Sequence, residues 1–364
     1  MEERTISLNK TATAVDVAKR AGVSQSTVSR VFNKNWKGPL NEETRRRVLK
    51  AAEELGYTPN ALAHMLTSKR SHMIGVVVSR EHDLFYADVL THLVNLLGEA
   101  GLRTMVFTCV PTQSINELLR DILQYQVDGV IITSAALSHN MNQERVDVDA
   151  PVVIYNGYLP EMNMNAVHSD NYGACIKAAE FLVGLGHKKF AYFTTGQSVY
   201  QNYMPRQDAF LFGLSRQGIY DCQIYSSGYR YERSLKAARE YFAAGDVADA
   251  IFCSGDLNAI ATIDAAREYG YEPGKDLSVA GFYAPMSVEF RAYQLTCLKQ
   301  DVLQLARDAV MILQSKIERP DCPVRIITRP MQLCIGETTR PCPKELADRL
   351  GAVPLVDENK GQPF

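Results

Sequence analysis

The stretch from Thr13 to Asn33, TAVDVAKRAGVSQSTVSRVFN, constrains this chain more than any other, because it predicts two short helices around a tight turn. Thr13 can cap the first helix, and Asp16, three residues later, can return the bond as a capping box. This helix carries a narrow stripe of small apolar residues at helical spacing: Ala14, Val17, Ala18 and Ala21. Small side chains let another helix approach closely, so the stretch predicts a compact helical bundle.

The second predicted helix has an inward apolar face and an outer face of hydrogen-bonding side chains. Ser24 can cap it, and Val28, Val31 and Phe32 point inward. The outer face contains no carboxylate and consists of Gln25, Ser26, Ser29, Arg30 and Asn33. Amides, hydroxyls and guanidinium groups bind base edges and phosphates, whereas the DNA backbone repels carboxylates. This pattern favours a helix that lies in a major groove; a helical pair inside an ordinary α domain is the alternative.

A third predicted helix and the distribution of charge support a DNA-binding head. Asn41 can cap this helix, and one of its sides is basic: Arg45, Arg46, Arg47 and Lys50. Residues 1–70 hold 13 Lys and Arg against 7 Asp and Glu, which leaves 26 against 34 for residues 71–364. A basic head on an acidic body indicates that the head meets a polyanion.

The whole sequence has the composition of a soluble protein of two or three domains. Its 364 residues are 46% hydrophobic and 22% charged. No apolar run approaches the ~18 residues of a membrane span, and the N-terminus lacks the pattern of a signal peptide. We therefore expect a cytoplasmic, nucleoid-associated protein with no membrane partner. The eight cysteines form no C-x-x-C pair, so we expect free thiols, no metal site and no cofactor.

From Met73 onward, short β-branched runs alternate with amphipathic segments, which predicts an α/β fold with doubly wound parallel sheets. The first set comprises strands at 74–79, 104–108, 129–133 and 152–155, with helices at 87–100 and 115–126. The pattern restarts with strands at 190–194, 223–225, 250–253 and 277–281 and helices at 206–217, 232–243 and 257–269, so we expect two lobes. Strand 295–298, helix 302–317 and strand 325–327 should cross back between the lobes. Residues 341–364 contain four prolines and predict a loose tail.

Three segments together resemble the lactose/galactose repressor (LacI/GalR) family of bacterial transcription regulators. They are DVAKRAGVSQSTVSRVFN, then ETRRRVLKAAEELGYTPNALAHML, then IGVVV, and the order of elements is similar to about Thr339. The resemblance implies flexible residues 1–12, a helix-turn-helix head at 13–57, and a hinge helix with its linker at 58–70. It further implies a two-lobe effector and dimerisation domain at 71–340, with the fold of periplasmic binding proteins. The loop from Asn33 to Asn41 is longer than the family norm.

The resemblance also implies which residues contact DNA. Gln25, Ser26 and Arg30 would read bases in the major groove. In the hinge, which orders on DNA, Leu66 would enter the minor groove as a wedge. Phosphate contacts would come from Thr13, Ser24, Thr27, Asn33 and Asn60, and Ser29 and Ala63 complete the implied interface. A homodimer or a tetramer would bind a pseudo-palindromic operator, because one head reads only a half-site.

A small-molecule effector is expected between the lobes, because open α/β sheets bind ligands at strand ends and pockets form between domains. The resemblance places Arg206 and Asp256 there, where a guanidinium and a carboxylate could bracket neighbouring hydroxyls of a sugar-like ring. It adds Phe85, Tyr86 and Tyr229 as ring-stacking aromatics, and Asn156 and Asn202 as polar lining residues. The alternatives are a helix-capping role for Asp256, a surface role for Arg206 and core positions for the aromatics.

We therefore expect a ligand-controlled transcription regulator, a repressor rather than an enzyme. Residues 270–276 mimic a phosphate-binding loop but are one residue short and lack its Ser or Thr, so a turn is the better interpretation. G-x-S-x-G, G-x-G-x-x-G and H-E-x-x-H motifs do not occur. Two other classes of protein remain open: a solute-binding protein of a transport system, and a small-molecule hydrolase or kinase on the same fold. Residues 13–66 disfavour the solute-binding protein.

Overall fold

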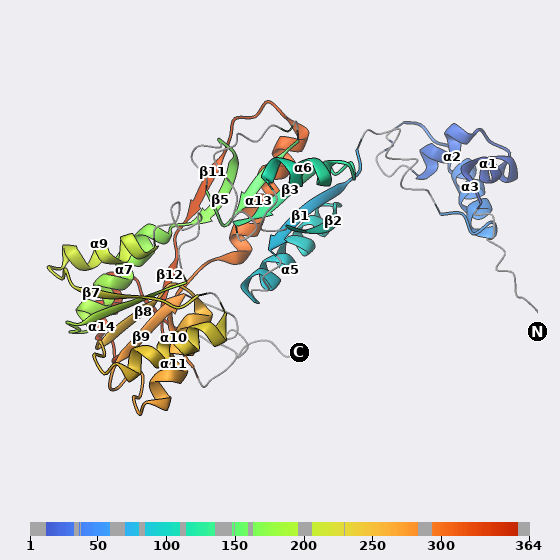
Figure 1. Cartoon of the computed structure of the whole chain (residues 1–364). Coiled ribbons are helices and arrows are strands. Elements are labelled where there is room, and N and C mark those ends of the chain that lie inside the picture. Colours follow the sequence, from blue (N-terminus) through green and yellow to red (C-terminus); the bar gives the residue numbers. More distant parts are fainter. Residues whose placement is uncertain are drawn as a thin grey trace, which may run out of the picture. The chain divides into compact units, whose positions relative to one another are not determined.

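The computed structural model describes residues 12–32, 36, 38–58, 70–79, 84–109, 114–134, 148, 150–158, 163–195, 206–228, 230–282 and 293–355. The chain divides into two compact units, Met1–Ser71 and His72–Phe364 (Figure 1).

In its described residues the first unit is a bundle of three helices: α1 (Ala14–Ala21), α2 (Gln25–Phe32) and α3 (Glu42–Glu54). Thr13 and Asp16 form the predicted capping box, and Gly22 ends α1 in the left-handed conformation with φ 64°. Asn41 caps α3 by accepting the N–H of Glu43 at 2.8 Å. Small side chains from all three helices meet in the core: Val17, Ala18, Ala21, Val28, Val31, Val48, Ala51 and Ala52. The predicted helical head is confirmed.

The second unit contains two lobes, each built on a sheet. In the described part of the chain, the sheet of the first lobe has the order β11-β5-β4-β3-β1-β2, and every neighbouring pair is parallel. Its strands are β1 (Met73–Ser79), β2 (Arg103–Cys109), β3 (Gly129–Thr133), β4 (Val152–Tyr155), β5 (Asn165–Ser169) and β11 (Ile326–Arg329). Its helices are α5 (Leu84–Glu99), α6 (Ile115–Leu123) and α13 (Val302–Glu318).

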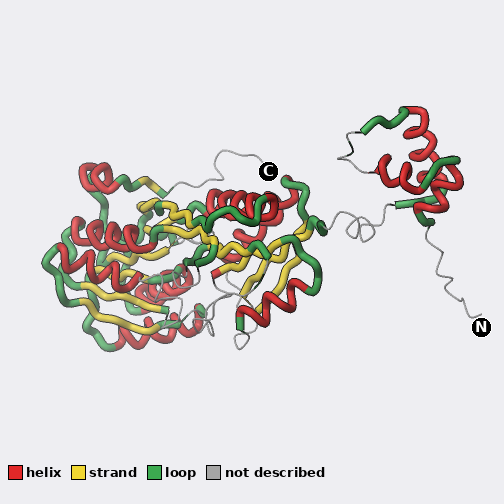
Figure 2. Tube along the Cα trace, turned by 90° about the horizontal axis from the view of Figure 1, so that it is seen from above, coloured by secondary structure: helices red, strands yellow, loops and turns green. Residues whose placement is uncertain are grey.

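Helices cover both faces of this sheet (Figure 2). Ile131 and Val153 pack with α5 and α13 on one face, whereas their neighbours Ile132 and Ile154 pack with α6 on the other. This alternation follows from the two-residue repeat of a strand, and it explains why these strands are continuously apolar.

The second lobe has a mixed sheet with the order β13-β12-β10-β9-β8-β6-β7 among the described residues. Its strands are β6 (Phe190–Thr194), β7 (Cys222–Ser226), β8 (Ala250–Cys253), β9 (Ser278–Phe282), β10 (Thr296–Lys299), β12 (Gln332–Ile335) and β13 (Val353–Pro354). Its helices are α7 (Asn171–Gly184), α9 (Arg206–Arg216), α10 (Tyr231–Ala243), α11 (Asp256–Glu268) and α14 (Lys344–Leu350). Buried side chains of α7, α9 and α14 fill one face, and those of α10 and α11 fill the other.

The chain passes between the lobes at three places. It leaves the first lobe between β5 and α7, returns between β10 and α13, and leaves again between β11 and β12. Two of these crossings are joined directly, because the N–H of Asp170 donates to the carbonyl oxygen of Arg329 at 2.8 Å. Arg329 also forms a two-point ion pair with the buried carboxylate of Asp308 on α13. The predicted return of the late segments between the lobes is confirmed.

The predicted loose tail at 341–364 is wrong for the part that the structure describes. α14 occupies Lys344–Leu350 and buries Leu346 and Leu350 against the second lobe. β13 then pairs with β12. These apolar residues anchor the segment because they fall four apart on one helical face.

Candidate functional site

The outer face of α2 is exposed, as its polar composition requires. Gln25, Ser26, Ser29 and Arg30 are exposed, and α2 carries no acidic residue. Ser24 accepts the N–H of Thr27 at 3.2 Å, which holds the start of the helix. Its hydroxyl also lies 2.8 Å from that of Ser26 and 2.9 Å from that of Thr27. Thr13 and Ser24 are exposed and Thr27 is half-buried, so the start of α2 presents a cluster of hydroxyls.

Arg30 turns toward the loop that follows α2. Its guanidinium carbon lies 4.9 Å from the ring centroid of Trp36. A cation over an indole face is attracted by the ring quadrupole. Four implied DNA contacts, Asn33, Asn60, Ala63 and Leu66, lie outside the described residues.

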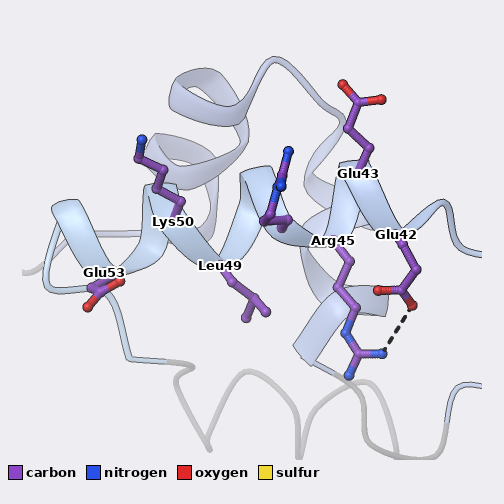
Figure 3. A pocket seen from close by; sticks show the side chains of 7 residues that line it. Glu42, Glu43, Arg45, Leu49, Lys50 and Glu53 are labelled. Atoms are coloured by element: carbon purple, nitrogen blue, oxygen red, sulfur yellow. Dashed lines mark ion pairs between the residues drawn. The ribbon is translucent and has the colours of Figure 1, made fainter.

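The exposed face of α3 is less basic than its arginines suggested. A shallow surface there is lined by Glu42, Glu43, Arg45, Arg46, Leu49, Lys50 and Glu53 (Figure 3). Its three carboxylates lie at the two ends and its three cations between them, and Arg45 pairs with Glu42 at 3.9 Å. Such an exposed pair contributes little to stability. The charge of this face is balanced, so α2 is the stronger candidate for contact with a polyanion.

In the second unit, Arg206 is held by polar and aromatic contacts. Its Nε donates to Oδ1 of Asn171 at 2.7 Å, and its Nη1 donates to the carbonyl oxygen of Ser254 at 2.7 Å. The guanidinium carbon lies 3.6 Å from the ring centroid of Phe282. Within the described residues Nη2 has no hydrogen-bond partner, so this nitrogen can serve a bound ligand.

Asp256 begins α11 two residues after Ser254. The turn that carries Asp256 therefore also supplies the carbonyl oxygen that accepts from Arg206. Its Oδ1 accepts the N–H of Leu257 at 2.7 Å, which is the helix-capping role that was the alternative. The side chain is half-buried rather than enclosed. The structure therefore brings Arg206 to the turn that carries Asp256.

The groups beneath Arg206 are neutral. Burial raises the pKa of the Cys175 thiol to about 12, and the positive charge of Arg206 only partly opposes this. Burial also raises the pKa of the Tyr192 hydroxyl well above its ordinary value. The Cys175 thiol and the Tyr192 hydroxyl are therefore uncharged, and neither forms an ion pair with Arg206 in place of a ligand.

The remaining effector candidates are divided between described and undescribed positions. Tyr86 lies in the first lobe, where its hydroxyl is 2.6 Å from that of Ser134 at the end of β3. Asn156 follows β4, is buried and has a φ of 56°. Phe85 lies in α5, but its side chain, like Asn202 and Tyr229, is outside the described residues.

Sequence reasoning missed Asn171, Ser254 and Phe282, which hold Arg206. A usable signal existed for Asn171, because the polar run Ser169-Asp170-Asn171 separates an apolar strand from a helix. Strand ends followed by polar residues mark the binding edge of an open sheet. Phe282 gave no such signal.

A second cluster of polar residues resembles a hydrolytic triad but is structural. His187 Nε2 lies 2.8 Å from Ser278 Oγ, and His187 Nδ1 lies 3.6 Å from Asp249 Oδ2. Ser278 is fully buried and accepts the N–H of Arg340 at 3.0 Å, so no substrate reaches its hydroxyl. Ser278 also begins β9, whereas Phe282 beside Arg206 ends it.

Two other kinds of site are absent from the described residues. These contain no group of three or more His, Cys, Asp or Glu side chains suited to a metal ion, and no helix with the length and apolar character needed to cross a membrane. All eight cysteines lie in the described part and are free thiols, as expected. The phosphate-loop mimic forms a turn between α11 and β9, with Gly270 and Gly274 at positive φ.

Comparison with known proteins identifies both units. The family model described as "Bacterial regulatory proteins, lacI family" matches residues 13–60, and the "Periplasmic binding protein-like domain" matches residues 179–339. The chain is 33% identical over 307 residues to the sucrose operon repressor of Lactococcus lactis subsp. lactis, across 83% of this chain and 92% of that protein.

Solved structures agree with this likeness. A complex of the transcriptional regulator CelR with cellobiose matches with a TM-score of 0.65 and 25% identity, over 90% of this chain and 99% of that one. The lac repressor dimer bound to operator and the anti-inducer ONPF matches in fold with a TM-score of 0.77 and 24% identity, over 91% and 100%. These relatives are regulators of transcription rather than enzymes, and the likeness extends over head and lobes alike: the chain belongs to the lacI family of bacterial regulatory proteins.

Proposed function

We propose that this protein is a sequence-specific repressor of transcription whose binding to operator DNA is controlled by a sugar-like effector. The observation that carries the proposal is the exposed, carboxylate-free outer face of α2 in a head that matches the lacI family. That face offers amide, hydroxyl and guanidinium groups, which are the groups that address base edges and phosphates.

In this proposal Gln25, Ser26 and Arg30 read bases, and the hydroxyl cluster at the start of α2 binds phosphate. Residues 13–57 act as the reading head, and residues 58–70 connect it to the lobes as a hinge helix and linker. A homodimer binds a pseudo-palindromic site, because one head covers one half-site. The lac repressor structure, a dimer on its operator, supports this arrangement.

The effector binds in this proposal at the strand ends between the lobes, with Arg206 as its principal donor. The contacts to Asn171, Ser254 and Phe282 fix the guanidinium before a ligand arrives, which lowers the entropic cost of binding. Asp256 supplies carboxylate oxygens that accept from hydroxyl groups. Sugars present such hydroxyls in neighbouring pairs, and the names of the sucrose operon repressor and of the cellobiose complex support this ligand class.

Control of DNA binding follows if the effector prefers one arrangement of the two lobes. A ligand shifts a conformational equilibrium only by its difference in affinity for the two states. A ligand that contacts Arg206 in the second lobe and Tyr86 in the first would bind differently in open and closed arrangements. The linker at 58–70 would carry this difference to the head.

Selection of bound duplexes from a random pool, with the full chain, tests both halves of the proposal. We expect enrichment of one pseudo-palindrome, and a changed affinity for it when one member of a sugar panel is added. A nucleoside panel serves as the control for the ligand class. Enrichment of no motif would overturn the DNA-binding half, and a response only to nucleosides would overturn the assignment of a sugar.

A further inference from the structure

The contact between Arg30 and Trp36 joins the outer face of α2 to the loop before α3. The guanidinium carbon of Arg30 lies 4.9 Å from the centroid of the indole ring. Within the described residues, the Arg30 side chain has no hydrogen-bond or ion-pair partner. The indole is therefore the group that orients the guanidinium in the head.

The indole itself is held by the backbone of its own loop. A Cβ atom placed on Gly38 would lie 2.6 Å, 2.8 Å and 2.9 Å from Cζ2, Cε2 and Nε1 of Trp36. Gly38 is not among the glycines at positive φ, so the indole rather than the backbone conformation opposes a larger residue here. Trp36 lies so close to Gly38 that a side chain at position 38 would displace the ring.

Burial does not account for this packing. Trp36 is 41% exposed and is not part of the head core. It is also the single tryptophan in the chain. Trp36 is an exposed aromatic ring that contacts Gly38 on one side and the guanidinium of Arg30 on another. The contact with Arg30 is therefore the interaction that its position suggests.

We propose that Trp36 is a positioning residue that fixes the guanidinium of Arg30 for reading a base edge. This inference rests on the proposed function, in which Arg30 contacts a base. A free arginine side chain must give up much rotamer freedom when it forms a two-point bond with a base. Its planar guanidinium stacks on an aromatic face, so the ring restricts those rotamers beforehand and leaves the N–H edge available.

The strength of an exposed cation–π contact sets the expected effect. Loss of the ring should weaken operator binding about two- to fivefold. Binding to random duplex should change less, because phosphate contacts do not depend on the orientation of Arg30. The ratio of operator to random affinity is therefore the diagnostic quantity.

A double-mutant cycle on the full-length protein tests the inference, with the selected operator and a random duplex at one salt concentration. Trp36→Ala should lower the affinity ratio, Trp36→Phe should restore most of it, and Trp36→Ala should have no further effect in the Arg30→Ala background. Gly38→Ala should reproduce Trp36→Ala, because its new Cβ displaces the indole. Leu55→Ala, which removes another apolar side chain that is 37% exposed in the head, is the matched control and should leave the ratio unchanged.

Failure of the inference and failure of the proposed function give different results. If Arg30→Ala lowers the ratio but Trp36→Ala does not, or if the two effects simply add, the positioning role is wrong while base reading by Arg30 stands. If Arg30→Ala leaves the ratio unchanged, the base-reading assignment fails and the inference fails with it.

Tryptophan fluorescence provides a readout that needs no DNA. Because Trp36 is the single indole, its emission in the free protein reports the contact directly. Arg30→Ala and Gly38→Ala should each shift the emission maximum or intensity, and Leu55→Ala should not. Unchanged emission in Arg30→Ala would show that the contact is absent in solution and would overturn the inference.

Discussion

Acidification should destabilise the second lobe through His187. The imidazole is 2% exposed, and burial lowers its pKa from 6.5 to about 4, with the charge of Arg340 acting in the same direction and Asp249 opposing it. The unfolded chain therefore binds a proton between pH 6.5 and 4 that the folded chain does not. Stability from this group is present above pH 6.5 and is lost as the pH falls toward 4.

The size of this effect follows from the shift in pKa. A difference of about 2.5 pKa units corresponds to about 3 kcal/mol in the free energy of unfolding, of which about 2 kcal/mol should be lost by pH 5. The local hydrogen bonds act in the same direction as burial. Ser278 Oγ already accepts the N–H of Arg340, so its own proton is available for a neutral imidazole nitrogen, whereas an imidazolium would need Ser278 to accept a second bond.

Urea denaturation followed by circular dichroism between pH 7.5 and 4.5 measures the effect. His187→Gln is the matched variant, because its amide reaches Ser278 but does not titrate in this range. The difference in unfolding free energy between the two proteins should shrink by about 2 kcal/mol between pH 7.5 and 5. A difference that is constant with pH would refute the reasoning, since the pKa of His187 would then be equal in the folded and unfolded chains.

Three further results are expected. Arg206→Lys should weaken effector binding by about ten- to hundredfold in calorimetry, because lysine keeps the charge but lacks the planar guanidinium with its fixed donor directions. The operator affinity without effector should be unchanged. Thr13→Ala should lower the stability of the head by about 1 kcal/mol in thermal unfolding, since the capping box is lost. Leu350→Ala should lower the stability of the lobes by about 2–4 kcal/mol, because α14 buries this side chain; an unchanged melting temperature would mean that the segment is dispensable.

The sequence was most informative where structure is determined by neighbouring residues. The capping box of α1, the glycine at its end and the polar face of α2 all follow from residues within four positions of one another. Strands such as β3 and β4 were found at their observed limits, because buried parallel strands are continuously apolar.

Elements with weak periodicity were missed. α7 buries Ala174, Ala178 and Phe181 but has no clear polar face, since α9 packs on it as well as the sheet. β5, which precedes α7, was missed with it. The surroundings of Arg206 were hidden for a different reason, because Asn171 and Phe282 are far from it in the chain and only the sheet order brings them together.

Because the chain crosses between the lobes, the first lobe can be completed only late in synthesis. The core of the first lobe consists of strands from the beginning of this unit and of α13, whose buried Leu305, Ala309 and Leu313 face Val76 and Leu93. Residues 170–301, about a third of the chain, emerge from the ribosome between these two halves of one core. The apolar surface of α5 and the early strands therefore stays uncovered until α13 has been translated, and β11 completes the sheet later still. Nascent chains that stop before residue 302 leave that surface exposed, so we expect them to aggregate unless chaperones bind them.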